Sequence, residues 1–102
     1  MYNVEVSKRA EDDLDNIITY ISQNLSAPKA ASDFADKIYD CYDNLENNPY
    51  IYSACNDSRL NKEGYRRALV KNYLVVFKIH EDNKAVHVHA IFHGSQDYVN
   101  LI

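Results

Sequence analysis

Residues 65–93 read YRRALVKNYLVVFKIHEDNKAVHVHAIFH, and this stretch decides the fold. It divides into three runs rich in β-branched and aromatic residues, at 65–70, 73–80 and 85–93, which polar residues at 71–72 and 81–84 separate. Runs of this composition between turn residues predict three strands joined by tight turns, and therefore an antiparallel meander. The run at 73–80 has apolar residues on both sides of the strand, so we expect this strand to be central. These residues are Tyr73, Leu74, Val75, Val76, Phe77 and Ile79.

The alternation within the last run predicts which of its side chains share a face. One set consists of Val86, Val88, Ala90 and Phe92. The other set consists of Ala85, His87, His89, Ile91 and His93. The first face indicates a buried core, and the second indicates a partly solvated surface.

Upstream of this stretch, the sequence indicates one strand followed by two helices. Apolar and polar residues alternate over 1–6, which predicts a short strand. Apolar residues recur at helical spacing from about 8 to 25 and again from 28 to 47, with Ser7 as a cap for the first helix. The short connection between the two helices predicts an antiparallel helical hairpin. Residues 49–64 show no clear period and are expected to form a loop.

The predicted fold class is therefore α+β, with the order β-α-α-β-β-β in a single domain over residues 1–102. An antiparallel sheet would carry the N-terminal helical hairpin on one face. Since two helices can cover only one face of a sheet, the other face should be free for partners or substrates. We expect that free face to carry the later histidines.

The charge of the chain is small overall but unevenly distributed. Its 102 residues carry a formal charge of −4. Residues 1–50 hold ten acidic and four basic side chains, whereas residues 51–102 hold five acidic and seven basic ones together with all four histidines. A net negative chain is a poor default binder of nucleic acid, because the phosphate backbone selects clustered Lys and Arg. The half of the chain that contains the predicted meander is mildly basic, however, so the net charge alone does not exclude binding of nucleic acid.

The sequence shows no signal for export, membrane insertion or disulfide formation. Its first residues lack the apolar core of a signal peptide, and no apolar run approaches the length of a membrane span, so we expect a cytoplasmic protein without a membrane partner. Cys41 and Cys55 match no metal-binding spacing and indicate two reduced structural thiols.

Three histidines form a weak candidate for a metal site. His87 and His89 should project from the same strand face, and His80 could approach from the neighbouring strand across the 81–84 turn. A His-x-His pair on an exposed strand is more often solvated, and no carboxylate with an obvious ligand role accompanies it. No metal or cofactor is therefore predicted.

Two segments resemble the RelE/ParE superfamily of toxins from type II toxin–antitoxin modules. One is residues 65–79, and the other is the tail His93-Gly94-Ser95-Gln96-Asp97-Tyr98, which is similar to that family's closing His-Gly-x-x-Asp-Tyr/Trp. The segments ITYI at 18–21 and AASDF at 30–34 also fall where ParE-like members have them. The resemblance covers nearly the whole chain and is closer to ParE-like members.

The resemblance implies a bacterial toxin that inhibits growth when free, contributes to plasmid stabilisation and is held inactive by a cognate antitoxin protein. ParE-like members bind DNA gyrase and trap its cleaved complex without chemistry of their own. RelE-like members instead cleave mRNA in the ribosomal A site. The resemblance by itself leaves the target open.

Departures from the nuclease pattern favour the ParE-like reading. Leu74 stands where RelE-like nucleases commonly have an Arg, and Ser95 and Gln96 stand where many relatives have one or two Arg. We therefore expect growth inhibition through binding of DNA gyrase. Two alternatives stay open: a ribosome-dependent mRNA endoribonuclease, and a family member that has lost toxicity and only binds antitoxin. Whether the chain is an enzyme is left open with them.

Five residues are the candidates for binding the target or the antitoxin: Arg66, Arg67, Lys71, His93 and Tyr98. RNA cleavage requires a group that takes a proton, groups that neutralise the developing oxyanions and a group that protonates the leaving oxygen. If the chain is a nuclease, Arg67, His93 and Tyr98 are the candidates for these roles. Because Arg66 and Arg67 are consecutive in a strand, only one of them can face the open side of the sheet.

Overall fold

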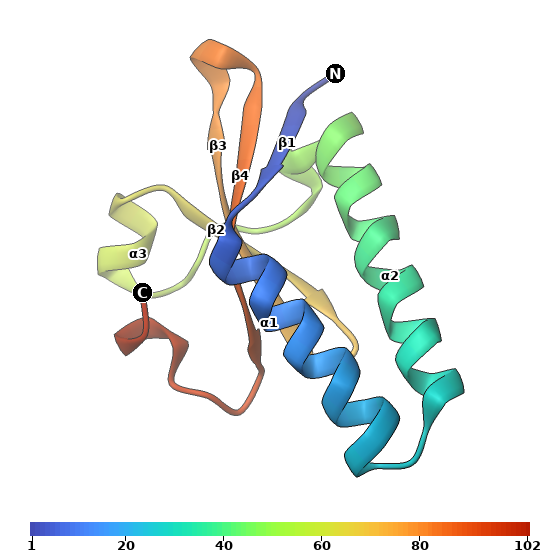
Figure 1. The fold of residues 1–102 in the computed structure, drawn as a ribbon. Helices are drawn as coiled ribbons and strands as arrows, with labels where there is room; N and C mark the ends of the chain where they lie inside the picture. Colours follow the sequence, from blue (N-terminus) through green and yellow to red (C-terminus); the bar gives the residue numbers. More distant parts are fainter.

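The computed structural model describes residues 1–102 and contains one four-stranded sheet in the order β1-β4-β3-β2 (Figure 1). The strands are β1 (Asn3–Val6), β2 (Tyr65–Val70), β3 (Tyr73–His80) and β4 (Ala85–His93). β3 pairs antiparallel with both β2 and β4, which confirms the predicted meander and the central position of residues 73–80. β1 pairs with β4 in parallel, so the sheet is mixed rather than wholly antiparallel.

Two long helices form an antiparallel hairpin on one side of the sheet (Figure 1). They are α1 (Lys8–Thr19) and α2 (Pro28–Asn47). Ser7 caps α1 as predicted, because its hydroxyl accepts a hydrogen bond from the backbone N–H of Ala10 at 3.0 Å. The helix then continues as a π-helical segment, Tyr20–Asn24, where the sequence predicted one uninterrupted α-helix.

The helical hairpin and the facing side of the sheet enclose the larger core. Its buried members are thirteen residues from α1, α2 and three strands: Ala10, Leu14, Phe34, Ile38, Cys41, Leu45, Ala68, Val70, Val75, Phe77, Val86, Val88 and Ile91. The apolar stripes of the two helices therefore meet β-branched residues of the sheet, as their periodicity predicted.

The opposite face of the sheet is not free, which corrects the expectation of an open surface. Residues 49–64 contain a short helix, α3 (Ser58–Lys62), and Figure 1 shows α3 and the C-terminus together on this side. Asp57 caps α3 by accepting a hydrogen bond from the backbone N–H of Leu60 at 3.0 Å. Leu60 then belongs to a second core with Cys55, Tyr65, Val76, Ala90 and Phe92.

A bulge in β4 reverses the predicted facing of its last residues. Val76 pairs with Ala90, but the next residue, Phe77, pairs with Val88, so His89 has no partner on β3. One extra residue shifts the alternation by one position. The predicted faces are therefore wrong beyond His89: Ala90 lies in the second core, whereas Ile91 returns to the helical side with Val86 and Val88.

The model has no helix with both the length and the apolar character needed to cross a membrane.

Candidate functional site

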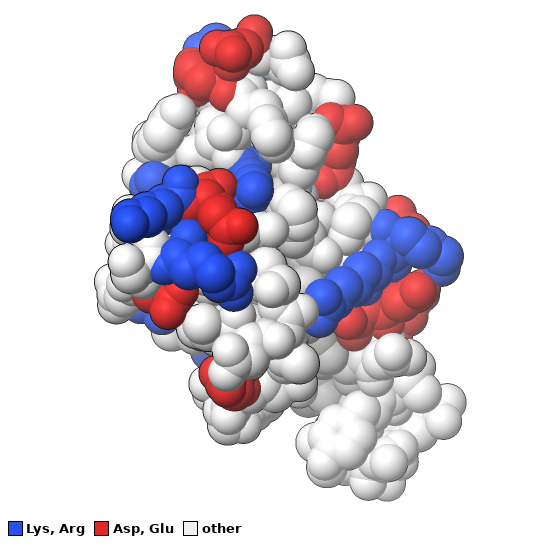
Figure 2. Space-filling view, turned by 90° about the vertical axis from the view of Figure 1, so that its left-hand side faces the viewer, with Lys and Arg blue, Asp and Glu red and all other residues white.

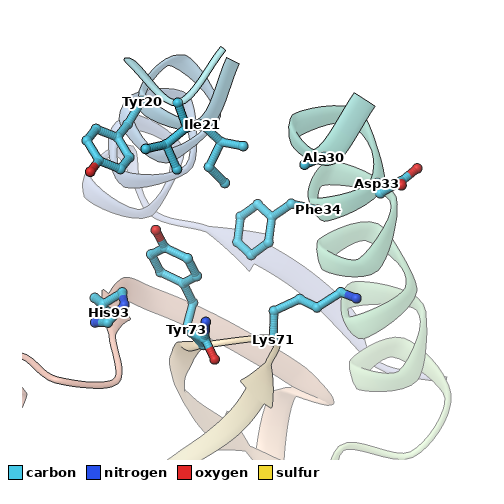
Figure 3. Close-up of a pocket in the computed structure, with 10 residues that line it drawn as sticks. Tyr20, Ile21, Ala30, Asp33, Phe34, Lys71, Tyr73 and His93 are labelled. Atoms are coloured by element: carbon cyan, nitrogen blue, oxygen red, sulfur yellow. The ribbon is translucent and has the colours of Figure 1, made fainter. Parts of the chain in front are cut away.

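A cleft of about 710 Å³ lies between the tip of the helical hairpin and the β2–β3 turn. Figure 3 shows aromatic and aliphatic side chains of the hairpin facing polar side chains of the sheet. The hairpin contributes Tyr20, Ile21, Leu25, Ala30, Asp33 and Phe34. The sheet and its turn contribute Lys71, Asn72, Tyr73 and His93. A concave, mainly apolar site with a few polar groups is typical of binding surfaces.

The π-helical segment shapes the apolar wall of the cleft. The backbone N–H of Leu25 donates to the carbonyl of Tyr20 at 3.1 Å, and Ser26 then reverses the chain with a left-handed φ of 49°. This arrangement leaves Tyr20 49% and Leu25 55% exposed. Large apolar side chains exposed together beside a cleft indicate a contact surface for another protein.

The β2–β3 turn builds the opposite wall. Lys71 takes a left-handed φ of 56° in the two-residue turn that pairs Val70 with Tyr73. The Asn72 carbonyl accepts a hydrogen bond from the backbone N–H of Gly94 at 2.7 Å. A Cβ atom at position 94 would lie only 3.2 Å from that carbonyl oxygen, so this close approach favours glycine. The end of β4 is thereby tied to the start of β3.

Tyr73 lies at the centre of the cleft, between an aromatic ring from each wall. Its ring centroid is 5.0 Å from that of Phe34 and 5.1 Å from that of His93, and the His93 ring is nearly perpendicular to it (Figure 3). Burial raises the pKa of the Tyr73 phenol. The hydroxyl therefore stays protonated near neutral pH, and it makes no hydrogen bond within the chain.

His93 is held by Ser95 and Gln96, two of the three residues that depart from the nuclease pattern. Its Nδ1 lies 2.6 Å from the Ser95 hydroxyl and 3.1 Å from the Ser95 backbone nitrogen, which donates to it. Its backbone N–H donates to the Gln96 side-chain oxygen at 2.7 Å. Ser95 and Gln96 therefore order the histidine, although neither supplies charge.

The two consecutive arginines lie on opposite faces of the sheet, as the strand alternation predicted. Arg66 pairs with Phe77 on the helical side, where its guanidinium donates to the Tyr52 carbonyl and lies 5.3 Å from the centroid of the Tyr50 ring. Arg67 pairs with Val76 on the other side. There it lines a hollow of about 440 Å³ together with Ile51, Tyr52, Ser53, Leu69, Leu74 and Gly94.

Tyr98 packs against the second core. Its ring centroid lies 6.1 Å from that of Phe92, a residue buried on the face opposite the helical hairpin. Arg67 and Tyr98 are therefore on one side of the sheet and His93 is on the other. The structure brings Lys71 and His93 to one cleft, but it does not bring together the three residues proposed for RNA cleavage.

The three histidines of the metal hypothesis do not form a metal site. The rings of His80 and His87 lie tilted by 45° with centroids 4.3 Å apart, and His87 Nε2 lies 2.6 Å from a Glu5 carboxylate oxygen. His89 instead packs edge-on against Tyr65 at 5.1 Å. The structure contains no group of three His, Cys, Asp or Glu side chains placed to hold a metal ion, so that weak candidate is not supported.

Charge on the α3 side of the molecule is mixed. Figure 2 shows Lys and Arg next to Asp and Glu on this side, with no continuous basic surface. One such pair is Arg59 with Glu63, whose nitrogen and oxygen are 2.9 Å apart. A groove that follows a nucleic-acid backbone needs a continuous run of positive charge, and this side does not provide one.

Sequence reasoning missed most of the apolar wall of the cleft. Ile21, Leu25 and Phe34 fit the helical stripes, which predict core positions, and Phe34 is indeed 3% exposed in the larger core although it also borders the cleft. Tyr20 and Tyr73 are not among the predicted site residues. The one available signal was the density of large apolar residues next to the Ser26-Ala27-Pro28 break, where a hairpin tip leaves them uncovered. Only the packing of the tip above the β2–β3 turn reveals the cleft.

Two solved structures share the fold of this chain. The chain is similar to a structure of the chromosomal ParDE TA system from P. aeruginosa, with a TM-score of 0.72 and 17% identity over 91% of this chain and 96% of that one. It is also similar to the toxin-antitoxin complex RelBE2 from Mycobacterium tuberculosis, with a TM-score of 0.65 and 17% identity over 90% and 96% of the two chains. The fold is that of the RelE/ParE superfamily.

A match of the sequence to a family model assigns the chain to a family. Residues 4–98 match the family model described as the ParE toxin of type II toxin-antitoxin system, parDE. The chain therefore belongs to the ParE toxin family, which confirms the resemblance of its strands and tail. No curated protein sequence matches the chain.

Proposed function

We propose that this ParE-family toxin inhibits growth by binding DNA gyrase, and that the cleft between the hairpin tip and the β2–β3 turn is its main contact surface. The observation that carries the proposal is the cleft itself. It combines exposed Tyr20 and Leu25 with the uncompensated ammonium of Lys71 and the free hydroxyl of Tyr73. Aromatic and aliphatic anchors beside a few polar groups are typical of protein-binding sites.

The separation of the nuclease candidates supports binding rather than catalysis. General acid–base cleavage of RNA requires its proton-transfer and charge-stabilising groups around one phosphate. Arg67 and Tyr98 lie on the face opposite His93. Leu74, which replaces the arginine of the nuclease pattern, is 93% buried and offers no charge to a phosphate.

A cognate antitoxin is the second expected partner. Both structural neighbours come from toxin–antitoxin systems, and this chain has the same fold. We propose that the antitoxin covers the cleft with an amphipathic segment whose carboxylates neutralise Lys71. Arg67 offers a second positive charge on the other face, next to the exposed Leu69.

Inhibition of supercoiling tests the gyrase proposal directly. The wild-type protein should inhibit purified gyrase and accumulate the cleaved complex, and Leu25→Asp should lose most of this inhibition because it places a charge in the apolar wall. Tyr39→Asp is the matched control, since Tyr39 is 56% exposed on α2 but lies outside the cleft. Equal loss in both variants, or no inhibition by the wild type at micromolar concentration, would contradict the proposal.

A ribosome-dependent endoribonuclease is the second candidate, because Lys71, Tyr73 and His93 place a cation, a phenol and an imidazole at one cleft. Toeprinting on translating ribosomes should then show cuts at codon positions that disappear in His93→Ala. If the wild type makes no such cuts, this candidate is rejected. The inactive-member alternative predicts that expression without antitoxin leaves growth unchanged, so clear arrest rejects it.

A further inference from the structure

β2 is the outermost strand on one side of the sheet, and a neighbouring loop pairs with only half of its outer edge. The backbone N–H of Arg67 donates to the Ser53 carbonyl at 3.0 Å, and the Tyr65 carbonyl accepts from the backbone N–H of Cys55 at 3.0 Å. Backbone groups that point to one side of an antiparallel strand recur at every second residue. Leu69 therefore also points its N–H and C=O away from β3, toward the outer edge.

The second half of this edge has no backbone partner. Ahead of Ser53 the chain forms a 3₁₀ turn, Pro49–Ile51, instead of continuing beside β2, and no hydrogen bond reaches the N–H or the C=O of Leu69. The Leu69 side chain is 70% exposed. Proteins usually protect an open strand edge with charge, proline or a bulge, because its free backbone groups can pair with another chain. An open edge at an exposed leucine is therefore a place where a partner can add a strand.

The hollow of about 440 Å³ borders this edge. Its apolar lining includes Leu69 together with Ile51, which is 56% exposed. Arg67 lines the same hollow, and its guanidinium has no ion-pair or hydrogen-bond partner, unlike those of the other arginines. No acidic side chain lines the hollow. The hollow is therefore complementary to a segment that carries an apolar side chain and a carboxylate.

The hollow continues into the cleft around the β2–β3 turn. Leu69 lies two residues before Lys71, and Gly94 directly follows His93; the first residue of each pair named here lines the hollow and the second lines the cleft. The cleft lies on the helical side of the sheet, whereas the hollow lies on the α3 side. One extended segment can contact both by passing around the turn. A folded domain seated in the cleft is separated from the hollow by that turn.

A second copy of this chain does not fit the edge. Two β2 strands that pair antiparallel through Leu69 would place Arg67 of each copy opposite Lys71 of the other. Like charges directly opposite each other destabilise a pair of strands. The positive charges before and after Leu69 instead favour a partner segment with acidic residues.

We propose that the cognate antitoxin adds a short strand to β2 at Leu69, and that this strand carries an apolar side chain for the hollow and a carboxylate for Arg67. The backbone of the strand donates to the Leu69 C=O and accepts from the Leu69 N–H. Because Ser53 occupies the edge opposite Arg67, the strand ends there, with its carboxylate beside the guanidinium. The inference rests on the proposed function in one respect, namely that an antitoxin binds this chain.

Hydrogen exchange of the Leu69 amide, resolved to single residues by mass spectrometry with electron-transfer fragmentation, measures the added strand directly. In the free toxin this amide should exchange fast, whereas those of Ala68 and Val70, which face β3, should exchange slowly. Excess full-length antitoxin, expressed from the neighbouring reading frame, should slow the Leu69 amide at least about tenfold, and purified gyrase should not.

Three results would overturn the proposal without any variant. They are fast exchange of the Leu69 amide in the antitoxin complex, protection of this amide by gyrase alone, and slow exchange in the free toxin, which would indicate pairing between copies. A toxin that binds no antitoxin would contradict the proposed partner as well. Normal antitoxin binding with a rapidly exchanging Leu69 amide would overturn only the added strand.

Two substitutions at Leu69 separate its backbone from its side chain. Leu69→Ala removes the side chain and keeps the N–H, whereas Leu69→Pro also removes the N–H, at an edge position that tolerates proline. Leu69→Pro should bind the antitoxin roughly three- to tenfold more weakly than Leu69→Ala, which is the effect of one hydrogen bond. Thermal unfolding checks that both variants are folded. Equal affinities of two folded variants would overturn the backbone pairing.

Arg67→Gln tests the carboxylate of the added strand. This variant should bind the antitoxin roughly three- to tenfold more weakly at low salt, and its affinity should fall less steeply as salt is added. Lys62→Gln is the matched control, because Lys62 is an exposed cation on α3 outside the hollow. Equal losses in both variants, or no loss in Arg67→Gln, would overturn the assignment of a carboxylate to Arg67.

Discussion

The two ends of β3 carry similar polar side chains in opposite states. At the β3–β4 turn, the Glu81 carboxylate accepts hydrogen bonds from the hydroxyls of Tyr2 at 2.7 Å and Tyr50 at 2.8 Å, and it pairs with Lys84. At the β2–β3 turn, the ammonium of Lys71 and the hydroxyl of Tyr73 have no partner and border an apolar cleft. We call these regions the closed end and the open end.

The polar groups of the closed end bond to one another within the folded chain, whereas those of the open end are free to bond to another molecule. Polar groups that are hydrogen-bonded to each other stabilise the folded chain. Donors without a partner, next to exposed apolar side chains, instead contribute to the free energy of binding another molecule. Changes at the closed end should therefore alter stability and leave binding unchanged. Changes at the open end should do the reverse.

Ile91→Ala should have the largest effect, because the bulge turns Ile91 into the larger core, where it is 96% buried. The variant leaves a cavity between the helical hairpin and the sheet. We expect a loss on the order of 2–5 kcal/mol in the free energy of unfolding, measured by urea denaturation. His89→Ala, at the extra residue of the bulge, should lose far less. An Ile91→Ala variant as stable as the wild type would mean that the bulge does not turn this side chain into the core.

Removal of one hydroxyl at each end gives a matched pair of intermediate effect. Tyr73→Phe should weaken gyrase binding roughly two- to tenfold while changing the free energy of unfolding by less than about 0.5 kcal/mol, since that hydroxyl has no partner in the folded chain. Tyr50→Phe removes a donor to Glu81 and should lower the melting temperature without changing gyrase binding. If both variants changed gyrase binding and melting temperature in the same way, the proposed difference between the two ends would be contradicted.

The pH dependence of stability should show the smallest effect, and only at the closed end. Lys84, Tyr2 and Tyr50 lower the pKa of Glu81 from 4.5 to about 2. A depressed pKa stabilises the folded protein above the unfolded value, and this contribution is lost as the pH falls from about 4.5 toward 2. Because Glu81 is solvent-exposed, the contribution is modest and screened by salt.

Thermal unfolding of Glu81→Gln between pH 7 and pH 2 measures this contribution. The wild type should melt at a higher temperature than the variant near pH 7, and the two should converge at the acid end. A difference that is constant with pH would show that the carboxylate charge plays no part. His93→Gln at the open end is the control variant, and it should not alter the decrease in melting temperature between pH 4.5 and pH 2.

The regular elements follow from local patterns in the sequence. The apolar periods of α1 and α2, the Ser7 cap of α1 and the two turns of the meander are each specified by residues close together in the chain, and the sequence predicts them near their observed bounds. The central position of residues 73–80 also followed from their apolar character on both sides. The sequence also indicates Lys71 and His93 as candidate site residues, and the structure places both at one cleft.

The missed features depend on contacts between distant segments. The bulge at His89 is supported by Ser7, whose hydroxyl donates to the His89 carbonyl at 2.8 Å, and by Asp13, which accepts the Ile91 N–H at 2.9 Å. Arg59 of α3 similarly donates to the Val99 carbonyl at 2.6 Å and helps hold the tail over the second face. No local period or motif encodes such pairings.

Hydrogen exchange of the protein, alone and with excess DNA gyrase, tests the central claim most directly. The exchange of every segment is compared in the same sample, so the two ends of β3 act as each other's control. We predict protection of residues 20–25, 71–73 and 93–96 at the open end, with no change at residues 79–85 of the closed end. Protection at the closed end alone, or unchanged exchange throughout the chain, would contradict the assignment of the cleft as the gyrase-binding surface.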